Sequence, residues 1–308
     1  MPEQKEIWDV IIVGAGIAGL SAGMYCGRFN SKTLVIGEMP GGVITTTHLV
    51  ENYPGILSIT GADMGQVFLE HAQKFGAKIA YGTVIDVEKS EEGGKTLFKV
   101  KTASGEEFFA KSLIIATGTQ HKKLGVAGEK EFYGKGVSYC ALCDAAFFKN
   151  KAVGIVGGGD SSAIEALILA EQCKKVYMFV RKDILRAEPI NYKKIMESKV
   201  IELRLKTEIA EIFGKGKVEG ILLKSGEKLA LDGVFIAVGH IPVSAIVSKI
   251  GVELDEKGQI KISRHSETNV AGVFAAGDVC DTAFKQAITG AAEAVTASYF
   301  AYQYLKKA

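Results

Sequence analysis

The hydrophobic residues near the start of the chain form a continuous run instead of an alternating pattern. Residues 8–13 read W-D-V-I-I-V, which is the length of a buried strand, and G-A-G-I-A-G follows directly. Small residues compatible with a helix continue to about Phe29, and residues 33–36 form a second apolar run. Because parallel strands covered by helices read as continuous apolar runs, this order predicts a β-turn-α-β unit.

The same order of elements returns in the second half of the chain. Residues 152–156 read A-V-G-I-V, G-G-G-D-S-S follows, a helical pattern covers 163–171, and a further strand ends at Val180. Each unit is followed by short alternating segments that close in an apolar run, at 113–118 and at 234–239. This repetition predicts an internal duplication of an α/β unit.

The turn of each unit has the G-x-G-x-x-G spacing of dinucleotide-binding sites. The three positions are Gly14, Gly16 and Gly19 in the first unit, and Gly157, Gly159 and, as a small third residue, Ser162 in the second. The first glycine allows the tight turn, the second lets backbone amides approach a pyrophosphate, and the third lets helix and strand pack closely. One such motif is weak evidence, but two in the same context predict two bound dinucleotides.

Composition and charge exclude several classes of protein. The chain has 308 residues, of which 47% are hydrophobic and 23% charged, and a formal net charge of +2, which suits about two globular domains. No basic run suggests a nucleic-acid surface, and no apolar run reaches the roughly 20 residues of a membrane helix. The glycines of residues 10–24 argue against a signal peptide, and five scattered cysteines argue against a secreted disulfide framework. We therefore expect a cytoplasmic protein that binds neither nucleic acid nor a membrane.

Several motifs, taken in their order and spacing, identify the family that the chain resembles. They are G-A-G-I-A-G, G-G-V-I-T-T-T with V-E-N-Y-P-G, I-I-A-T-G, G-K-G-V-S-Y-C-A-L-C-D, G-G-G-D-S-S, G-H-I-P, and A-A-G-D-V with K-Q-A-I-T. Over essentially its full length the chain resembles the low-molecular-weight thioredoxin reductases. The resemblance implies an α/β fold of two Rossmann-like, three-layer ββα dinucleotide-binding domains, the second inserted into the first.

The resemblance also implies a division of labour between the domains. Residues 1–118 and 243–308 would form an FAD-binding domain, and residues 119–242 an NAD(P)H-binding domain that carries the C-x-x-C motif. A homodimer is implied, with electrons passing from NADPH through FAD and a Cys140–Cys143 disulfide to a thioredoxin-like or glutaredoxin-like protein.

Residues from both ends of the chain are expected to bind FAD by this resemblance. The first glycine motif would hold the pyrophosphate, and Glu38, about twenty residues further on, would bind the adenosine ribose unless it is a solvated turn acid. The residues expected along the flavin and its linker are Gly41, Gly42, Asn52, Gly277, Asp278, Lys285, Gln286 and Ala287. Asp278 has a helix cap as its alternative role, and Lys285 stands where the family often has arginine.

The C-x-x-C-D sequence admits a zinc half-site, simple packing or a working dithiol. Zinc would need further cysteine or histidine ligands at suitable spacing, and the other three cysteines are scattered singly. A pair of thiols between two nucleotide-binding units favours two-electron disulfide chemistry. By the family pattern, Cys143 receives electrons from the flavin, Cys140 attacks the partner's disulfide, and Asp144 manages the proton unless it is a helix cap.

The second glycine motif, with Asp160 and Ser161, should bind the electron donor. Arg181, Lys182 and Arg186 follow the next strand, where a 2′-phosphate would lie, and favour NADPH. Departures from the family pattern here leave NADH, reduced ferredoxin or a deazaflavin open as donors. A dithiol oxidase and a non-enzymatic flavoprotein are the remaining alternatives.

Overall fold

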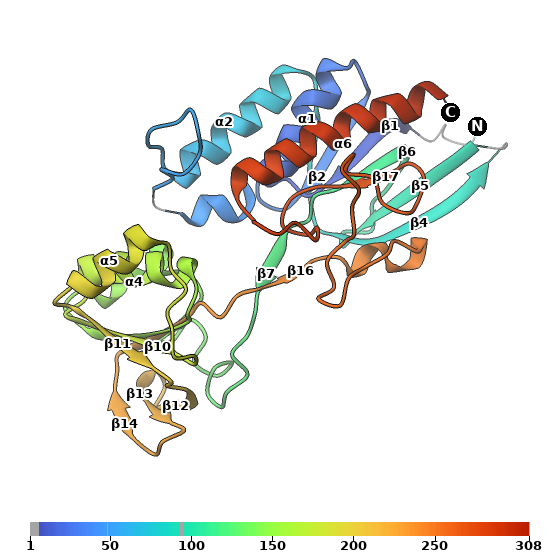
Figure 1. Ribbon diagram of the computed structural model, residues 1–308. Helices are drawn as coiled ribbons and strands as arrows, with labels where there is room; N and C mark the ends of the chain where they lie inside the picture. Colours follow the sequence, from blue (N-terminus) through green and yellow to red (C-terminus); the bar gives the residue numbers. More distant parts are fainter. Residues whose placement is uncertain (1–5, 48, 93–94, 308) are drawn as a thin grey trace. The chain divides into compact units, whose positions relative to one another are not determined.

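The computed structural model describes residues 6–47, 49–92 and 95–307, and the chain forms two compact units. The first unit combines the chain up to Gln120 with the segment from Pro242 onward, and the second spans His121–Ile241 (Figure 1). The boundaries expected from the sequence, 118/119 and 242/243, lie within two residues of these. Since the first unit uses both parts of the chain, the second is an insertion into it.

The first unit is built on a seven-stranded sheet with the order β3-β2-β1-β6-β5-β4, in which β17 also pairs with β6. The strands β1, β2, β3, β6 and β17 pair in parallel, and β4, β5 and β6 pair antiparallel. Their bounds are β1 Ile7–Val13, β2 Thr33–Gly37, β3 Lys78–Tyr81, β4 Val84–Glu92, β5 Lys95–Thr102, β6 Glu107–Ile115 and β17 Val273–Ala275. The parallel part contains the first unit predicted from the sequence.

Three long helices cover one face of this sheet. They are α1 (Ile17–Arg28), α2 (Gly61–Lys74) and α6 (Ala287–Lys307), and a single 3₁₀ turn, η1 (Gly42–Thr46), follows β2. Because successive strand residues point to opposite faces, Val10 and Ile12 of β1 pack with Leu20 of α1 and Ala294 of α6 on this side. The same alternation sends Ile11 and Val13 to the other face.

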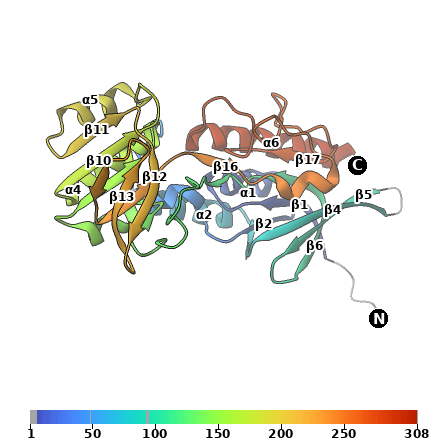
Figure 2. The same cartoon turned by 90° about the horizontal axis from the view of Figure 1, so that it is seen from below.

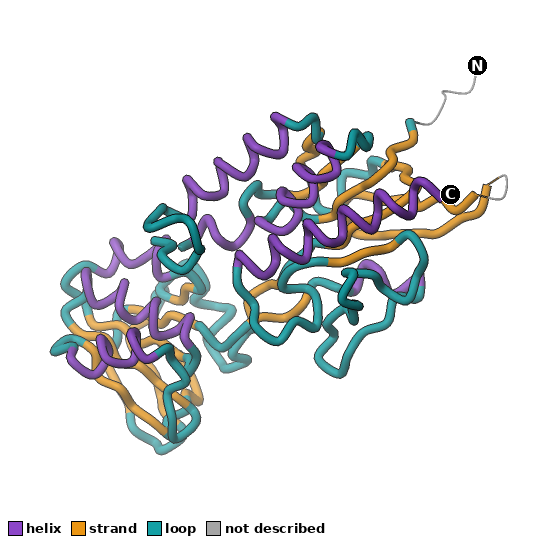
Figure 3. The backbone as a smooth tube through the Cα atoms, turned by 45° about the horizontal axis from the view of Figure 1, so that its top comes forward, coloured by secondary structure: helices purple, strands orange, loops and turns teal. Residues whose placement is uncertain are grey.

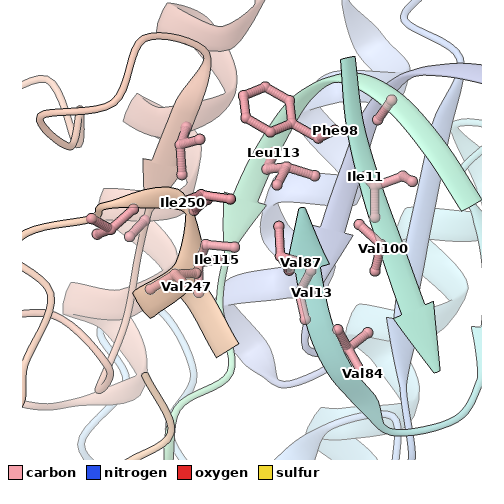
Figure 4. Packing of buried hydrophobic residues seen from close by; sticks show 14 of the residues in the cluster. Ile11, Val13, Val84, Val87, Phe98, Val100, Leu113, Ile115, Val247 and Ile250 are labelled. Carbon is pink, nitrogen blue, oxygen red and sulfur yellow. The ribbon is translucent and has the colours of Figure 1, made fainter. Parts of the chain in front are cut away.

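The other face of the sheet is covered by its own antiparallel strands and by a 3₁₀ helix. Figure 4 shows this packing, in which Ile11 and Val13 lie with Val87 of β4 and with Val247 of η3 (Ala245–Ile250). Phe98 of β5 is completely buried here. The parallel sheet therefore lies between a helical layer and a β layer, which is the predicted three-layer arrangement.

The second unit repeats this plan with a smaller sheet. Five parallel strands have the order β11-β10-β9-β15-β8, and three more form a separate antiparallel sheet, β12-β13-β14. Their bounds are β8 Val137–Ser138, β9 Ala152–Val156, β10 Lys175–Val180, β11 Ile201–Leu205, β12 Ile209–Gly214, β13 Val218–Leu223, β14 Lys228–Ala230 and β15 Gly233–Ile236. Both units thus have the α/β class that the sequence predicts.

Helices and the antiparallel sheet again take opposite faces. On one side, Ile155 of β9 packs with Ala166 of α4 (Asp160–Gln172) and Ile195 of α5 (Pro189–Glu197). Figure 2 shows α4 and α5 on the side of β10 and β11 away from β12 and β13, and Figure 3 shows the helices of this unit together on one side of its strands. On the other side, Val156 packs with Ile221 of β13. The short α3 (Ala141–Asp144) and η2 (Ala145–Phe148) join the helical side.

The two passages of the chain from one unit to the other run side by side. The segments β7 (Thr119–His121) and β16 (His240–Pro242) form a two-stranded sheet of their own. At one end, the Val243 amide donates to the Gly118 carbonyl oxygen at 3.0 Å, and at the other the Lys122 amide donates to that of Gly239 at 2.9 Å. The insertion is therefore connected through a paired ribbon.

Helix α6 is long and buries only one face. Its buried residues are mostly small, including Gly290 and Ala297, and Ser298 donates to the Ala22 carbonyl oxygen of α1 at 3.2 Å. Small residues let the two helices approach closely. Across the described parts of the chain, no helix has both the length and the apolar character needed to cross a membrane.

Candidate active site

The first glycine turn of the first unit is required by the protein's own packing at two positions. Gly14 has φ +113°, and a Cβ there would lie 2.1 Å from the Ala116 carbonyl oxygen. A Cβ on Gly19 would lie 1.8 Å from the Gly14 carbonyl oxygen. Both distances are far below van der Waals contact, so any side chain would force strand and helix apart. These are the tight-turn and close-packing roles expected from the spacing.

Gly16 lies between them and has a different environment. It is the N-cap of α1 with extended backbone, and the nearest atom to an added Cβ would be the Gly41 carbonyl oxygen at 3.8 Å. The protein itself therefore has room for a side chain at Gly16. An absent side chain in open space beside a helix N-terminus fits the close approach of a dinucleotide pyrophosphate.

The loop after β2 lies directly against this turn. The Gly41 amide donates to the Ala15 carbonyl oxygen at 2.8 Å, and a Cβ on Gly42, which has φ +63°, would lie 2.9 Å from the Gly16 Cα. Glu38, just beyond the end of β2, accepts a hydrogen bond from the Thr83 hydroxyl. The residues expected to bind the pyrophosphate and the ribose therefore share the carboxyl edge of the parallel strands.

The second half of the predicted FAD site is formed by the turn after β17. Gly277 has φ +81°, and its amide donates to a Glu293 carboxylate oxygen at 2.8 Å, while the Thr282 hydroxyl donates to the other oxygen. A Cβ on Gly277 would lie 3.0 Å from the Ala18 Cβ of α1. Glu293 therefore holds the turn that carries Asp278 against the first helix, and no motif in the sequence predicts this role.

Hydrogen bonds also connect Asn52, Lys285 and Gln286. The Asn52 side-chain amide donates to the Gln286 side-chain oxygen at 3.0 Å, which ties two segments 234 residues apart. The Lys285 ammonium donates to the carbonyl oxygens of Asp278 and Cys280, both at 2.6 Å. Lys285 thus supports the backbone of the turn, while Ala287 begins α6. The predicted residues from both parts of the first unit gather at one edge of its sheet.

In the second unit, Cys140 and Cys143 form a disulfide whose Cα atoms are 5.4 Å apart. Cys140 is the N-cap of α3, and its sulfur accepts a hydrogen bond from the Cys143 amide at 3.1 Å. Cys143 is exposed and Cys140 half-buried, whereas the three other cysteines are buried free thiols. Among the described residues, no group of three metal-binding side chains occurs.

The second glycine turn repeats the logic of the first. A Cβ on Gly157 would lie 2.4 Å from the Ala237 carbonyl oxygen, so packing requires this glycine. Gly159, the N-cap of α4, has no atom within 4 Å of an added Cβ. The Ser162 hydroxyl accepts from the Gly159 amide at 3.0 Å and donates to its carbonyl oxygen at 2.6 Å, which closes the first helical turn. Of the three motif positions, only Gly159 is not required by the protein's own packing, which fits the close approach of a ligand there.

A cavity of about 710 Å³ opens beside this turn and is predominantly basic. Ser161, Arg181, Lys182 and Arg186 line it, as the sequence predicts for a donor site. Basic side chains that sequence reasoning left unassigned also line it, namely His121, Lys122, Lys123, Lys224 and His240. They come from the ribbon between the units and from the end of β13, segments far from the glycine motif. These side chains meet only in the folded chain. Because they are widely separated in the sequence, no local pattern predicts that they share one cavity.

Asp160 has a structural role at this turn. Its Oδ1 accepts hydrogen bonds from the Glu188 amide at 2.7 Å and from the Asn191 side-chain amide at 2.9 Å. These bonds connect the start of α4 to the start of α5. Asp160 is not among the residues that line the cavity, so its carboxylate faces the neighbouring helix.

Two further carboxylates near the disulfide were not predicted. Glu129 is only 5% exposed and accepts from the amides of Leu124 and Gly125, at 2.8 and 2.6 Å, and from the Tyr139 hydroxyl at 2.6 Å. It thereby joins the cavity wall to the residue before Cys140. Three such bonds compensate a buried carboxylate.

Glu165 is the second of these carboxylates and lines the cavity. Its Oε2 accepts from the Ala141 amide, the residue after Cys140, at 3.4 Å. Burial raises the pKa of this carboxyl to about 7, and the hydrogen bond from Ala141 acts against the rise.

Comparison with known proteins agrees with this arrangement. Residues 8–295 match the pyridine nucleotide-disulphide oxidoreductase family. The chain belongs to this family. Use of a flavin and of a nicotinamide nucleotide goes with it, and the expected class of enzyme, an oxidoreductase, is confirmed.

Individual relatives are similar over the whole length of the chain. The thioredoxin reductase of Listeria innocua is 40% identical, with 100% of this chain and 97% of the relative covered. That of Bacillus subtilis is 40% identical, with 99% and 96% covered. The crystal structure of Lactococcus lactis thioredoxin reductase has a TM-score of 0.92 at 37% identity, covering 98% of this chain and 100% of that one. These similarities confirm the resemblance and the fold that the motifs predicted.

Proposed function

We propose that this protein is a thioredoxin reductase that uses FAD and NADPH. Electrons from NADPH pass through the flavin to the Cys140–Cys143 disulfide and from there to the disulfide of a thioredoxin-like protein. The observation that carries the proposal is the Cys140–Cys143 disulfide, located in the unit that also holds the basic nucleotide cavity. The full-length similarity to thioredoxin reductases supports the choice of partner. Glutaredoxin-like partners, a homodimeric assembly and a cytoplasmic location belong to the same proposal.

FAD would be held at the carboxyl edge of the first unit's sheet. Gly14, Gly16 and Gly19 would shape the pyrophosphate site, with Gly41 and Gly42 beside it and Glu38 at the adenosine ribose. Asn52, Gly277, Asp278, Gln286 and Ala287 would lie along the ribityl–isoalloxazine end, with Lys285 supporting the turn from behind. When bound, the flavin accepts a hydride and passes on the two electrons.

NADPH would occupy the basic cavity of the second unit. Gly157, Gly159, Ser161 and Ser162 would approach its pyrophosphate, and Asp160 would hold the turn in place. Within the described parts of the chain, no carboxylate lies within ion-pair distance of the side chains of Arg181, Lys182 and Arg186. Three uncompensated cations favour a 2′-phosphate over a ribose hydroxyl.

The dithiol would divide its two tasks between its sulfur atoms. Two electrons and two protons convert the disulfide into two thiols, and one thiolate then attacks the partner's disulfide to form a mixed disulfide. We assign this attack to Cys140 and the exchange with the flavin to Cys143. Asp144, the last residue of α3, would supply or remove the proton at the sulfur that changes state. The Cys143 amide, 3.1 Å from the Cys140 sulfur, would stabilise a thiolate there.

The test is anaerobic flavin reduction in the purified protein, followed by turnover with a thioredoxin. NADPH should bleach the flavin band faster than NADH by at least tenfold, and a Cys143→Ser variant should keep this step but lose thioredoxin reduction. If neither nucleotide bleaches a flavin that dithionite still reduces, the nicotinamide assignment fails and ferredoxin or a deazaflavin becomes the donor. If bleaching is fast but no thioredoxin is reduced, the reductase assignment fails, and oxygen uptake with dithiols would then identify a dithiol oxidase.

A further inference from the structure

Glu165 is the residue at which the two functional parts of the second unit meet. Its side chain lines the basic cavity together with the glycine turn at the start of its own helix, α4. The same carboxyl accepts a hydrogen bond from the Ala141 amide at 3.4 Å. Ala141 is buried, follows Cys140 directly, and belongs to the same apolar cluster as Ala163 and Ala166 of α4. The position of Glu165 relative to the disulfide is therefore fixed by packing.

The disulfide side of this contact is equally well defined. Cys140 caps α3 with its sulfur, which accepts from the Cys143 amide. The amide of Ala141, the residue directly after Cys140, donates to the Glu165 carboxyl. An ionised carboxylate at that amide places a negative charge beside the end of the C-x-x-C helix where a thiolate would form. Like charges in a partly buried place disfavour each other, so an ionised Glu165 opposes a Cys140 thiolate.

The surroundings of Glu165 do not hold its carboxyl group in one protonation state. Within the described part of the chain, no lysine, arginine or histidine lies within ion-pair distance of it, and burial raises its pKa to about 7. The helix α5 meets α4 through Asn191 and Asp160, and β9 and η2 carry no titratable side chains. The titratable groups of α3, its N-cap and the cavity wall are Cys140, Cys143, Asp144, His121, Lys122, Lys123, Arg181, Lys182, Arg186, Glu208, Lys224 and His240. Those of α5 are Tyr192, Lys193, Lys194 and Glu197. In β10 and β11, Lys175 and Arg204 pair with Glu202 and lie over the ring of Tyr177.

We propose that Glu165 is a positioning residue that couples occupancy of the basic cavity to the redox equilibrium of the Cys140–Cys143 pair. A dinucleotide in the cavity displaces water from the carboxyl and brings phosphate charge near it, and both effects favour the protonated form. A neutral Glu165 no longer opposes the Cys140 thiolate, so the reduced pair becomes more stable when the cavity is filled. The choice of nucleotide rests on the proposed function, whereas the contact between Glu165 and the C-x-x-C helix does not.

The electron and proton balance of the coupled step is explicit. The disulfide takes up two electrons, its S–S bond breaks, and one proton goes to one sulfur while the other remains a thiolate. The electrons come from the reductant of the proposed reaction, or from a dithiol buffer in the test. The proton on Glu165 comes from solvent when the nucleotide binds. A change of one pKa unit at a coupled group corresponds to about a tenfold change in the equilibrium.

The experiment measures the dithiol-to-disulfide ratio of the FAD-loaded protein in anaerobic dithiothreitol buffers of fixed ratio at pH 7.5, by acid quench and thiol labelling. The cavity is filled with 3-aminopyridine adenine dinucleotide phosphate, which cannot accept a hydride, and its binding is followed separately by calorimetry. In the wild type the analogue should raise the ratio by about three- to tenfold. Glu165→Gln, which keeps an oxygen for the Ala141 amide, should show the raised ratio without analogue and no further change with it.

A matched control is Glu208→Gln, because Glu208 also lines the cavity but pairs with Lys224 at 2.9 Å. This variant should keep the response to the analogue. If the analogue binds and the wild type does not respond, or Glu165→Gln responds as the wild type does, the coupling is refuted while the proposed function stands. If the analogue does not bind, the donor assignment fails, and coupling to nucleotide occupancy fails with it.

A pH titration of the dithiol-to-disulfide ratio without ligand tests whether the charge of Glu165 acts on the cysteine pair. Below pH 7 Glu165 is protonated in the wild type, so the wild type and Glu165→Gln should have the same dithiol-to-disulfide ratio. As the pH rises through about 7 the carboxyl ionises, and the wild-type ratio should fall below that of the variant. Parallel profiles over this range would show that Glu165 does not act on the pair at all.

Discussion

Two glycines of the first turn differ in how much room the protein leaves for a side chain, and single substitutions can test this difference. At Gly16 an added Cβ meets its nearest atom only at 3.8 Å, whereas at Gly19 it would lie 1.8 Å from a carbonyl oxygen. Gly16→Ala should therefore leave the folded apoprotein almost unchanged. The alanine loses a few tenths of a kcal/mol as a helix cap and gains about 0.4–1 kcal/mol from a less flexible unfolded chain, so the net change should stay within about 0.5 kcal/mol.

The same methyl group should obstruct the cofactor. If the FAD pyrophosphate lies against the Gly16 backbone, a methyl group there separates it from the amides of the helix start. A loss of tenfold or more in FAD affinity corresponds to about 1.4 kcal/mol or more. Gly19→Ala, in contrast, must push helix and strand apart, which we expect to cost about 2–4 kcal/mol in apoprotein stability, as strained core substitutions do.

The assay uses deflavinated protein. Urea unfolding gives the stability of the apoprotein, and quenching of FAD fluorescence on titration gives its affinity. A loss of more than about 2 kcal/mol in apoprotein stability for Gly16→Ala would show that the folded protein has no room for this methyl group. An FAD affinity equal to that of the wild type would show that the pyrophosphate does not lie against Gly16. Gly159→Ala, with no atom within 4 Å, should behave likewise toward NADPH and serves as an internal repeat of the test.

Three further outcomes follow from the second unit and from the cysteines. Arg181→Glu should lower kcat/KM for NADPH by at least tenfold and leave that for NADH within threefold, as measured by stopped-flow flavin reduction; equal losses for both would place Arg181 outside the 2′-phosphate site. Asp160→Ala should lower the melting temperature, because it removes the bonds to α5 worth about 1–2 kcal/mol in total, and an unchanged melting temperature would show that these bonds contribute nothing. Iodoacetamide at pH 8 should label only Cys140 and Cys143, and only after reduction, because burial raises the pKa of the other thiols well above this pH; mass spectrometry that finds a third labelled cysteine in the folded protein would contradict this.

Local patterns in the sequence were sufficient for the elements that depend on local physics. A continuous apolar run followed by glycines and small residues specifies a parallel strand and its helix, and β1, α1 and β2 formed as the pattern predicts. The C-x-x-C pair is also local, since three residues of separation bring the two Cα atoms to 5.4 Å. These features could be predicted because neighbours in the sequence create them.

The roles of individual site residues depend on which partners their side chains contact in the folded protein. Asp160 belongs to the nucleotide motif by position, yet its carboxylate bonds to α5, and Lys285 bonds to the carbonyl oxygens of its own turn. Glu165 is buried by the folded chain and accepts a hydrogen bond from Ala141, 24 residues away, and the ring of His121 lies 5.0 Å from that of His240. No short pattern contains such pairs, because the strand order brings them together.

The pairing around residues 117 and 243 has a consequence for how such a protein is assembled from parts. The Val243 amide and carbonyl oxygen bond to Gly118 and to the Thr117 hydroxyl, at 3.0 and 2.6 Å. The two points at which the chain leaves and re-enters the first unit are thus hydrogen-bonded neighbours within that unit. Excising the segment between them and rejoining the ends with a few glycines would not stretch the chain. The first unit, to which we assign FAD binding, can therefore be treated as a separate module, and the second unit as a domain inserted between two neighbouring points of its chain.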